Sequence, residues 1–322
     1  MYPPPMRAAA LLVLLGGVSS ALALDACVGD SPTGVVPVAD GGAKDTSVTD
    51  GPVPACDNTK NWATPVMLGG VNSNAVEADP TLTSDELTII FSSTRLVNGS
   101  NDFNFWIAQR ASKTAPFNAP NILEPITANG INTTADDHSG TLTGDGLKFI
   151  FRSNRGGNSD LYQVTRATQQ AAFAAPVSLT DLNTPADELG PSVTSNGARL
   201  VFQTTPVDGG STAFFEATPN GNTWAKKPLA GDFLGNDSDL VLANDGLHAY
   251  VASGRPTSAG FDDIWSVMRP ALDQPFVVGN NLVAINSAAV DRPSWISPDG
   301  CHLYFWSGRG GNAHIYYVER LP

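Results

Sequence analysis

The sequence predicts an all-β fold, a five-bladed β-propeller built from four-stranded antiparallel blades. Three observations predict it. A turn of the type Asp-Gly, or a close variant, recurs five times at intervals of 60, 51, 49 and 54 residues, which is enough chain for four strands per repeat. Apolar residues at every second position follow each turn, as in a strand with one face in a core. No segment has the period of an amphipathic helix.

The repeats carry the same features in the same order. The turns are Ser84-Asp85-Glu86, Gly144-Asp145-Gly146, Ser195-Asn196-Gly197, Asn244-Asp245-Gly246 and Pro298-Asp299-Gly300. The apolar columns after them are Leu87, Ile89, Phe91; Leu147, Phe149, Phe151; Ala198, Leu200, Phe202; Leu247, Ala249, Val251; and Cys301, Leu303, Phe305. One strand precedes each turn, and a polar turn and a third strand follow the column. The repeats lie near residues 77–110, 136–166, 187–217, 236–269 and 290–320.

The position of the fourth strand predicts how the ring closes. Segments of the type aromatic-x-x-Pro-x-x-Leu, or close to it, occur at 173–179, 224–229 and 276–282. The same pattern occurs at 62–68, before the first strand of the first repeat. The chain ends just after the third strand of the fifth repeat. We therefore expect the N-terminal strand to complete the last blade, which protects the sheet edges.

The residues before the repeats predict export. Residues 1–26 read as a signal peptide, with Arg7 as the only charge before an apolar run that is short for a membrane-spanning helix. Residues 27–56 are rich in Gly, Pro, Asp and Thr and read as a disordered tether. The propeller is expected to occupy residues 57–322.

Two cleavage sites compete within this leader. Ala21-Leu22-Ala23 resembles an ordinary signal-peptidase site, whereas Leu24-Asp25-Ala26-Cys27 resembles a bacterial lipobox, whose cysteine becomes lipidated. Asp25 stands where that motif has a small or apolar residue. The tether after Cys27 favours the lipobox. We expect a protein of the bacterial envelope, held at a membrane through a lipid on Cys27, with free periplasmic release as the alternative.

The two other cysteines lie where the ring is expected to close. Cys56 precedes the N-terminal strand, and Cys301 opens the second strand of the last blade. In an antiparallel blade these two points lie at the same end, so a Cys56–Cys301 disulfide is expected in an oxidising compartment. Such a bond across a long loop stabilises by about 5 kcal/mol in the chain-entropy model. The alternative is a buried thiol at Cys301.

The last repeat resembles the TolB-type Pro-Asp β-propeller repeat family. The resemblance rests on Ser297-Pro298-Asp299-Gly300, on Leu303-Tyr304-Phe305, on Ser307-Gly308-Arg309-Gly310-Gly311 and on Ile315-Tyr316. It is nearly as good around Asp145-Gly146 and Ser153-Asn154-Arg155-Gly156-Gly157, and it extends over about 62–322. It implies a cell-envelope protein that scaffolds or binds partners, although many members have six blades. A propeller by itself does not fix a function.

An acidic residue lies eight positions before each turn's Asp or Asn. These acids are Glu77, Asp137, Glu188, Asp237 and Asp291, and the turns after the second strands carry Arg95, Arg155, Arg255 and Arg309. Both sets are expected at one mouth of the central channel. The acids form either a collar that binds a cation, an amine, a basic peptide or Ca²⁺, or structural ion pairs with the arginines. The third repeat lacks its arginine, so Glu188 is the acid expected to be free.

The composition and the positions of the histidines exclude some classes of function. A formal net charge of −13 excludes a nucleic-acid partner, which needs clustered Lys and Arg. The four histidines are scattered, with His248 and His302 expected to face solvent, so no metal site is predicted. We expect a non-catalytic, monomeric binding module for a protein or peptide partner. The alternative is a carbohydrate-binding or glycoside-hydrolase propeller that uses Glu77, Asp137 and Glu188 at the channel mouth.

Overall fold

The structure, a computed structural model, describes residues 56–57, 60–206 and 210–321. The expected signal peptide, Cys27 and the tether up to residue 55 lie outside these residues. Every regular element in the described ranges is a β-strand, and none is a helix. These residues therefore include no helix long and apolar enough to cross a membrane.

The strands form five four-stranded antiparallel sheets. Blade 1 contains β2 (Glu77–Leu82), β3 (Thr88–Ser93), β4 (Asn104–Gln109) and β5 (Asn121–Ile122). Blade 2 contains β6 (Asp137–Leu142), β7 (Lys148–Ser153), β8 (Asp160–Thr165) and β9 (Val177–Ser178). Blade 3 contains β10 (Asp187–Val193), β11 (Leu200–Thr205), β12 (Ala213–Asn220) and β13 (Thr223–Pro228).

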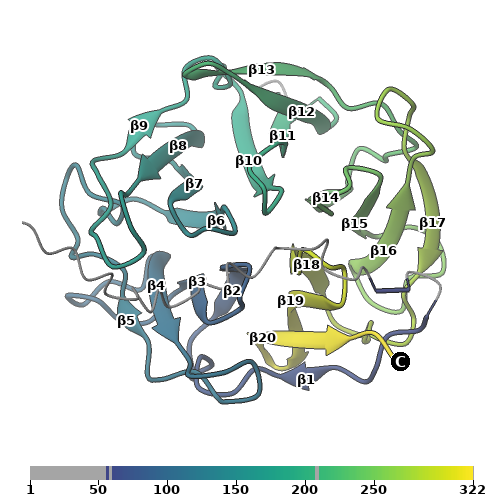
Figure 1. Cartoon of the computed structure of the whole chain (residues 1–322), viewed down its shortest axis with the longest axis horizontal. Coiled ribbons are helices and arrows are strands. Elements are labelled where there is room, and N and C mark those ends of the chain that lie inside the picture. Colours follow the sequence, from purple (N-terminus) through teal and green to yellow (C-terminus); the bar gives the residue numbers. More distant parts are fainter. Residues whose placement is uncertain (1–55, 58–59, 207–209, 322) are drawn as a thin grey trace, which may run out of the picture. The chain divides into compact units, whose positions relative to one another are not determined.

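The last two blades follow the same order. Blade 4 contains β14 (Ser238–Leu242), β15 (His248–Ser253), β16 (Asp263–Met268) and β17 (Val277–Asn281), and blade 5 contains β18 (Asp291–Ile296), β19 (His302–Gly310), β20 (Asn312–Glu319) and β1 (Val66–Met67). The innermost strands β2, β6, β10, β14 and β18 contact one another in a ring around a common axis (Figure 1). The predicted five-bladed propeller is confirmed.

The N-terminal strand closes the ring as the sequence predicts. β1 pairs with β20 through Val66 opposite Tyr317, and Trp62 forms a bridge with Arg320. Cys56 and Cys301, the predicted pair, form a disulfide with their Cα atoms 5.2 Å apart. Blade 5 is thus built from both ends of the described chain, and a covalent bond fastens it.

Every inner strand contains a register shift within its first six residues. Four blades place a residue with positive φ there: Asp79, Ser139, Gly190 and Asp239, with φ between 50° and 52°. Blade 5 has Pro293 instead, whose ring holds φ negative. A β-bulge of this kind redirects one side chain, and here it places these residues on the central channel.

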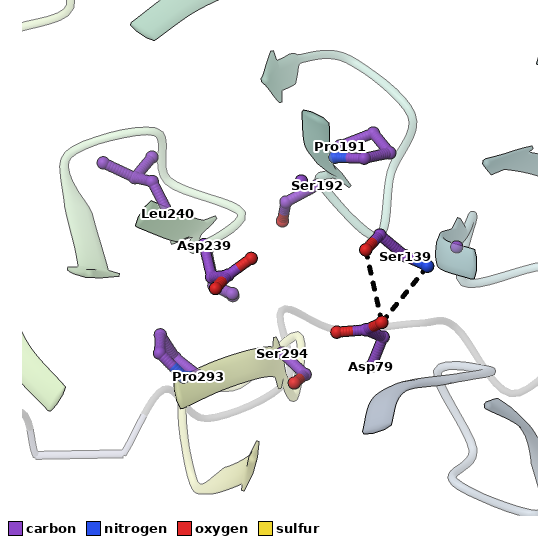
Figure 2. A pocket seen from close by; sticks show the side chains of 11 residues that line it. Asp79, Ser139, Pro191, Ser192, Asp239, Leu240, Pro293 and Ser294 are labelled. Atoms are coloured by element: carbon purple, nitrogen blue, oxygen red, sulfur yellow. Dashed lines mark hydrogen bonds between the residues drawn. The ribbon is translucent and has the colours of Figure 1, made fainter. Parts of the chain in front are cut away.

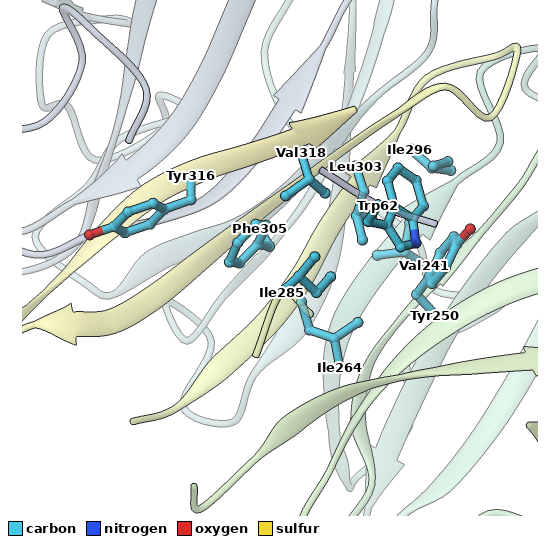
Figure 3. Close-up of a cluster of buried hydrophobic side chains, with 10 residues drawn as sticks. All are labelled: Trp62, Val241, Tyr250, Ile264, Ile285, Ile296, Leu303, Phe305, Tyr316 and Val318. Carbon is cyan, nitrogen blue, oxygen red and sulfur yellow. The ribbon is translucent and has the colours of Figure 1, made fainter. Parts of the chain in front are cut away.

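The predicted apolar columns form the core between neighbouring blades. Their second and third members are fully or almost fully buried, among them Phe91, Phe149 and Phe305. Figure 3 shows the cluster at blades 4 and 5, where Trp62 from the N-terminal segment meets Tyr250 with ring centroids 6.0 Å apart. The fourth strand of blade 1, β5, lies in Phe117-Asn118-Ala119-Pro120-Asn121-Ile122-Leu123, which has the fourth-strand pattern but was not assigned from the sequence.

Candidate functional site

The five repeated acids lie at or next to the start of the inner strands, and none reaches solvent. Each is at most 1% exposed. Blade 2 shows how the side chain is held: Arg155 Nη2 donates to Asp137 Oδ1 at 2.7 Å, and Thr133 donates from its backbone N and its hydroxyl to Oδ2 at 2.6 and 2.7 Å. The carboxylate therefore ties the loop before the inner strand to the turn that carries the arginine.

The same clasp, an acid held by a rim arginine, occurs in four blades. The ion pairs are Arg95–Glu77 at 3.2 Å, Arg155–Asp137 at 2.7 Å, Arg255–Asp237 at 2.7 Å and Arg309–Asp291 at 2.7 Å. Each arginine also donates to a backbone carbonyl of the preceding loop. Removing one partner of a buried pair leaves an uncompensated charge, so these carboxylates are used within the fold. The geometry favours the structural interpretation of the acids over the collar.

Blade 3 replaces its missing arginine with a residue that the sequence reasoning did not identify. Lys226, on the fourth strand β13, donates from Nζ to the carbonyl of Leu182 and lies 5.7 Å from the centroid of Phe215. In blade 2, Arg155 makes the equivalent contacts to Ile131 and Tyr162. Unpaired with an arginine, Glu188 is nevertheless buried and accepts bonds from Thr184 N and Oγ1 at 3.1 and 2.6 Å. As expected, Glu188 has no arginine partner among the described residues, but it is not free to bind a ligand, because it is buried and bonded to the loop at Thr184.

The pKa of Glu188 differs from that of an ordinary glutamate. Burial raises it, whereas the two bonds from Thr184 and the charge of Lys226 act in the opposite direction. A carboxyl with a raised pKa is a candidate general acid only if a substrate can reach it. Its side chain is covered, so the described structure gives a substrate no such access.

The central channel is narrow. Bulge residues of the inner strands line a cavity of about 20 Å³, close to the volume that one water molecule needs (Figure 2). At the turns between first and second strands, Ser84 Oγ and Ser195 Oγ lie 2.7 Å apart, and a Cβ added to Gly144 would lie 2.0 Å from both oxygens. At the level of the bulges and at the end formed by these turns, the channel therefore has no space for a sugar ring or a peptide.

Two carboxylates point into the channel cavity, Asp79 and Asp239 (Figure 2). Asp79 accepts bonds from Ser139, and Asp239 pairs with Arg292 at 3.0 Å. Burial raises the pKa of Asp239, and the charge of Asp79 adds to this effect. Burial acts to raise the pKa of Asp79 as well, but the bond and charge of His138 outweigh it and lower that pKa. In the described ranges, no three His, Cys, Asp or Glu side chains are placed to hold a metal ion.

A much larger hollow lies where blade 4 meets blade 5, and we name it the seam groove. Its volume is about 480 Å³, within the range of ligand-binding clefts. One wall is blade 4 and the other is the N-terminal segment with the end of β20. The apolar lining residues are Trp62, Ala249, Tyr250, Val267, Met268, Leu282, Val283 and Ala284. Of these, Met268 and Val283 are 53% and 72% exposed, so the groove presents apolar surface to solvent.

The charged residues that line the seam groove are basic. They are Lys60 and Arg320, joined by His248. Arg320 is positioned by bonds from Nη2 to the Tyr250 hydroxyl at 2.8 Å and from Nη1 to the Lys60 carbonyl at 2.8 Å, and it stacks 4.2 Å from the centroid of Trp62. His248 Nδ1 lies 2.6 Å from Asp245 Oδ2 of its own blade. Apolar surface and basic groups therefore converge in one hollow.

The equivalent interface between blades 5 and 1 is filled. There Glu86, buried at the turn of blade 1, accepts bonds from Lys113 Nζ and the Tyr304 hydroxyl at 2.9 Å each, and its Oε1 lies 2.9 Å from His302 Nδ1. Arg110 Nη2 also donates to the Tyr304 hydroxyl at 3.0 Å. His302 was expected to face solvent, and this expectation is wrong, because its ring turns to a buried carboxylate.

The comparisons with known proteins agree on the fold. No protein-family model matches the sequence, and no curated protein sequence is significantly similar to it. Similar solved structures include the endo-arabinase of Bacteroides thetaiotaomicron, with 12% identity and a TM-score of 0.54 over 80% of this chain and 98% of that one. The α-L-arabinofuranosidase of Podospora anserina has 13% identity and a TM-score of 0.51 over 82% and 97% of the two chains.

A TolB from Acinetobacter baumannii is also among the similar structures. It has 15% identity and a TM-score of 0.46, and the match covers 78% of this chain and 55% of that one. The chain thus spans about half of the length of that protein. The two matches with TM-scores above 0.5 show a shared propeller fold alone. The resemblance to the TolB-type repeat family therefore stays a prediction from the sequence.

Proposed function

We propose that this protein is a non-catalytic β-propeller that binds a protein or peptide partner. The observation that supports this most is the contrast between channel and rim. Four of the five repeated carboxylates are held in arginine clasps, and the fifth, Glu188, is buried and bonded to Thr184. The channel cavity has room for one water molecule. The apolar, solvent-accessible hollow lies on the rim instead. Exposed apolar surface that is rimmed by polar groups marks interaction sites.

We further propose that the protein works outside the cytoplasm, in the bacterial envelope, with its tether attached to a membrane through Cys27. The Cys56–Cys301 disulfide supports an oxidising compartment, and the leader and the lipobox-like Leu24-Asp25-Ala26-Cys27 support export. The intact mass of the exported protein tests the anchor. A mass that begins at a diacylglyceryl-modified Cys27 is expected, and an unmodified Cys27 thiol would exclude the anchor.

The binding function is tested by selecting peptides from a random display library on the immobilised full-length protein. The affinity of the selected peptides is then measured in solution by calorimetry. We expect peptides with a Kd of about 1–100 μM, which is −8 to −5 kcal/mol of binding free energy. If selection enriches no sequence above a bare-surface control, the proposal is wrong.

The glycoside-hydrolase alternative makes the opposite prediction. The fold is shared with the arabinan- and arabinofuranoside-cleaving enzymes above, and a hydrolase would use channel carboxylates as acid and base. We expect no release of reducing sugar from arabinan by the wild-type protein. Release that disappears in Asp239→Asn but persists in the surface variant Asp102→Asn would make the chain a hydrolase and overturn the binding proposal.

A further inference from the structure

We infer that the outer edge of blade 4 binds an extended segment of a partner protein, which adds to β17 as a fifth strand. The segment places an apolar side chain in the seam groove and a Lys or Arg beside Asp232 and Asp273. This inference rests on the proposed binding function and deepens it, since it names the site and the class of ligand. Three observations carry it: the free edge of β17, the place of this strand beside the seam groove, and the excess of acidic residues in blade 4.

The outer strands of four blades are protected against pairing, and the outer strand of blade 4 is not. In three blades a proline stands three positions after the aromatic residue of the fourth-strand pattern, and only two strand residues follow it: Pro65 before β1, Pro120 before β5 and Pro176 before β9. In blade 3, β13 contains Lys226 and Lys227 and ends at Pro228. In blade 4 the position is Gly279, and β17 runs through it for five residues without a proline or a charge. Proline, charge and short length are the features that prevent an edge strand from pairing.

The backbone of β17 presents hydrogen-bonding groups on its outer side. Phe276, the residue before β17, bonds outward: its N donates to the Ala230 carbonyl at 2.9 Å, and its carbonyl accepts from Asp232 N at 3.1 Å. Backbone groups of a strand point alternately to its two sides, so those of Val278, two residues on, also point outward. β17 is the last strand of its sheet, and no other strand of the described residues pairs with it on that side. An extended peptide binds such an edge through main-chain hydrogen bonds.

β17 lies on the rim of the ring and forms part of the wall of the seam groove (Figure 1). Gly279 and Asn281 line the groove, together with Met268 on the neighbouring strand β16. Side chains of a strand point alternately to the two faces of a sheet, so every second residue of an added strand faces the groove. The volume of about 480 Å³ and the aromatic walls formed by Trp62 and Tyr250 fit an inserted aromatic or aliphatic side chain.

The charge of blade 4 favours a basic partner. Residues 230–289 contain seven aspartates, no glutamate and no lysine. Both of their arginines lie in ion pairs, Arg255–Asp237 and Arg269–Glu216. Two exposed acids lie where β17 begins: Asp232, whose N bonds the Phe276 carbonyl, and Asp273, three residues before Phe276. A partner segment with a Lys or Arg at this end is attracted, whereas the same acidic surface of a second copy is repelled.

NMR titration of the full chain with defined peptides tests the inference. The probes are N-acetyl-Lys-Thr-Xaa-Thr-Xaa-Thr-Gly amides, in which each Xaa is Val, Leu, Phe or Trp, so that Lys and both apolar residues share one face of a strand. One control set has Glu in place of Lys. A second control set is N-methylated at two neighbouring central residues, which removes a hydrogen-bond donor from each edge of the peptide.

Three resonances report on the site. The Met268 methyl group lies in the groove, and the exchange of the Val278 N–H with solvent reports on the edge of β17. The Met67 methyl group on β1 is the reference, because Met67 does not line the groove and is 47% exposed, close to the 53% of Met268. A shift of Met268 alone shows a ligand in the groove, and slower exchange of Val278 in addition shows the added strand.

We expect at least one Lys peptide to shift Met268, slow the exchange of Val278 and leave Met67 in place, with a Kd of about 0.1–1 mM. Its Glu version should bind about three- to tenfold more weakly, because a weak attraction between exposed charges becomes a repulsion. Its N-methylated version should not change either resonance, since it keeps the side chains but loses main-chain donors.

Gly279→Pro gives blade 4 the proline that blades 1, 2 and 5 carry at this position, so the fold should tolerate it. A Cβ there meets Ser266 Oγ at 2.9 Å, and a hydroxyl can turn away. We expect binding to weaken at least about tenfold. Val277→Lys, at a 51% exposed position of β17, should also weaken binding about tenfold, because a lysine on an edge strand opposes pairing and repels the basic peptide. Val177→Lys, at a 65% exposed position of β9, is the matched control and should bind like the wild type.

Several results would overturn the inference. It fails if no Lys peptide changes both Met268 and Val278, if the Glu or N-methylated versions bind equally well, or if Val277→Lys binds like the wild type. It also fails if both resonances change with protein concentration alone, because a second copy then pairs with β17. Peptides selected from the display library that bind without changing Met268 or Val278 would refute this site and leave the proposed function standing, whereas the absence of any selected peptide refutes the function itself.

Discussion

The interfaces at the two sides of blade 5 use the same tyrosine–arginine contact and differ in almost everything else. Between blades 5 and 1, Tyr304 and Arg110 are sealed by Glu86 and its partners. Between blades 4 and 5, Tyr250 and Arg320 keep the contact, but they face a hollow of about 480 Å³. One repeat position thus gives a closed joint at one side of the blade and an open groove at the other.

Two features produce the difference. The first is the turn residue: Glu86 holds a φ of 59°, a conformation that four blades give to glycine, and such a non-glycine residue costs about 1 kcal/mol or more of strain. Its buried bonds offset that cost. The second is chain continuity: β4 and β5 of blade 1 are joined by a loop, whereas β20 and β1 of blade 5 come from opposite ends of the chain. The groove is a consequence of how the ring closes.

The largest expected effect on stability comes from loosening the interface between blades 4 and 5, where the seam groove lies. The Cys56→Ala/Cys301→Ala double variant removes the bond that holds the N-terminal segment, which forms a wall of the groove. We expect a loss of about 4 kcal/mol in the free energy of unfolding, measured by urea denaturation. A loss below about 1 kcal/mol would mean that β1 and Trp62 hold the segment without it.

Removing the charge of Glu86 at the closed side, the interface between blades 5 and 1, should have the next largest effect on stability. Glu86→Gln leaves Arg110, Lys113 and His302 without the buried carboxylate, and we expect a loss of about 3 kcal/mol in unfolding free energy. The matched control is Asp245→Asn, which removes the exposed partner of His248 on the open side and should cost under about 0.5 kcal/mol. Equal effects of the two variants would contradict the comparison.

The pH dependence of stability should also come from the closed side. Burial acts to raise the pKa of Glu86, but its bonds to His302, Lys113 and Tyr304 outweigh this and lower it from 4.5 to about 2. The stabilisation is therefore present above pH 4.5 and is lost as the pH falls toward 2, by about 3 kcal/mol in total. Unfolding of the wild type between pH 5 and 2 measures this slope, which should be much smaller in Glu86→Gln.

The contact between Glu86 and His302 also affects stability at higher pH. The bond to Glu86 raises the pKa of His302 above its usual 6.5. A raised histidine pKa stabilises the fold fully below pH 6.5, and this contribution is lost as the pH rises through the pKa of the folded state. NMR titration of the His302 ring measures that pKa, and Glu86→Gln should bring it back toward the usual value. An unchanged midpoint would refute the contact.

The smallest effect is a difference between two tyrosines. Tyr304→Phe loses a bond to a charged carboxylate and one from Arg110, and we expect a cost of about 2 kcal/mol. Tyr250→Phe loses one bond from Arg320 and should cost about 1 kcal/mol. The two unfolding curves, recorded under the same conditions, give the difference. If Tyr250→Phe cost more, the open side would be the better-ordered joint.

The fold could be predicted from the sequence because each feature of the repeat occurs five times. Five turns and five apolar columns agree with one another, and the pattern at 62–68 located the closing strand β1, which pairs with β20. The equal spacing of the acids identified a repeated element, but spacing cannot show whether a carboxylate faces a channel or an arginine. That distinction depends on the loop three to six residues before each acid, as Thr133 and Ile131 show for Asp137.

Features that break the repeat were harder to predict. In blade 3, Lys226 takes the place of the arginine at the Leu182 carbonyl and comes from the fourth strand instead of the turn, so no aligned position indicated it. The seam groove arises from residues as distant as Lys60 and Arg320, which come together only when the ring closes. One signal was available: Glu86 stands where the other turns have Gly146, Gly197, Gly246 and Gly300. It marks the joint that the protein seals by itself.

The most direct test of the account is a crystal structure of the protein soaked with phenylacetate, which combines an aromatic ring with a carboxylate. We expect the ring of phenylacetate in the seam groove, between Trp62, Tyr250 and Met268, and nothing bound beside Glu86. An empty seam groove, or phenylacetate bound in the channel at Asp79 and Asp239, would contradict the account.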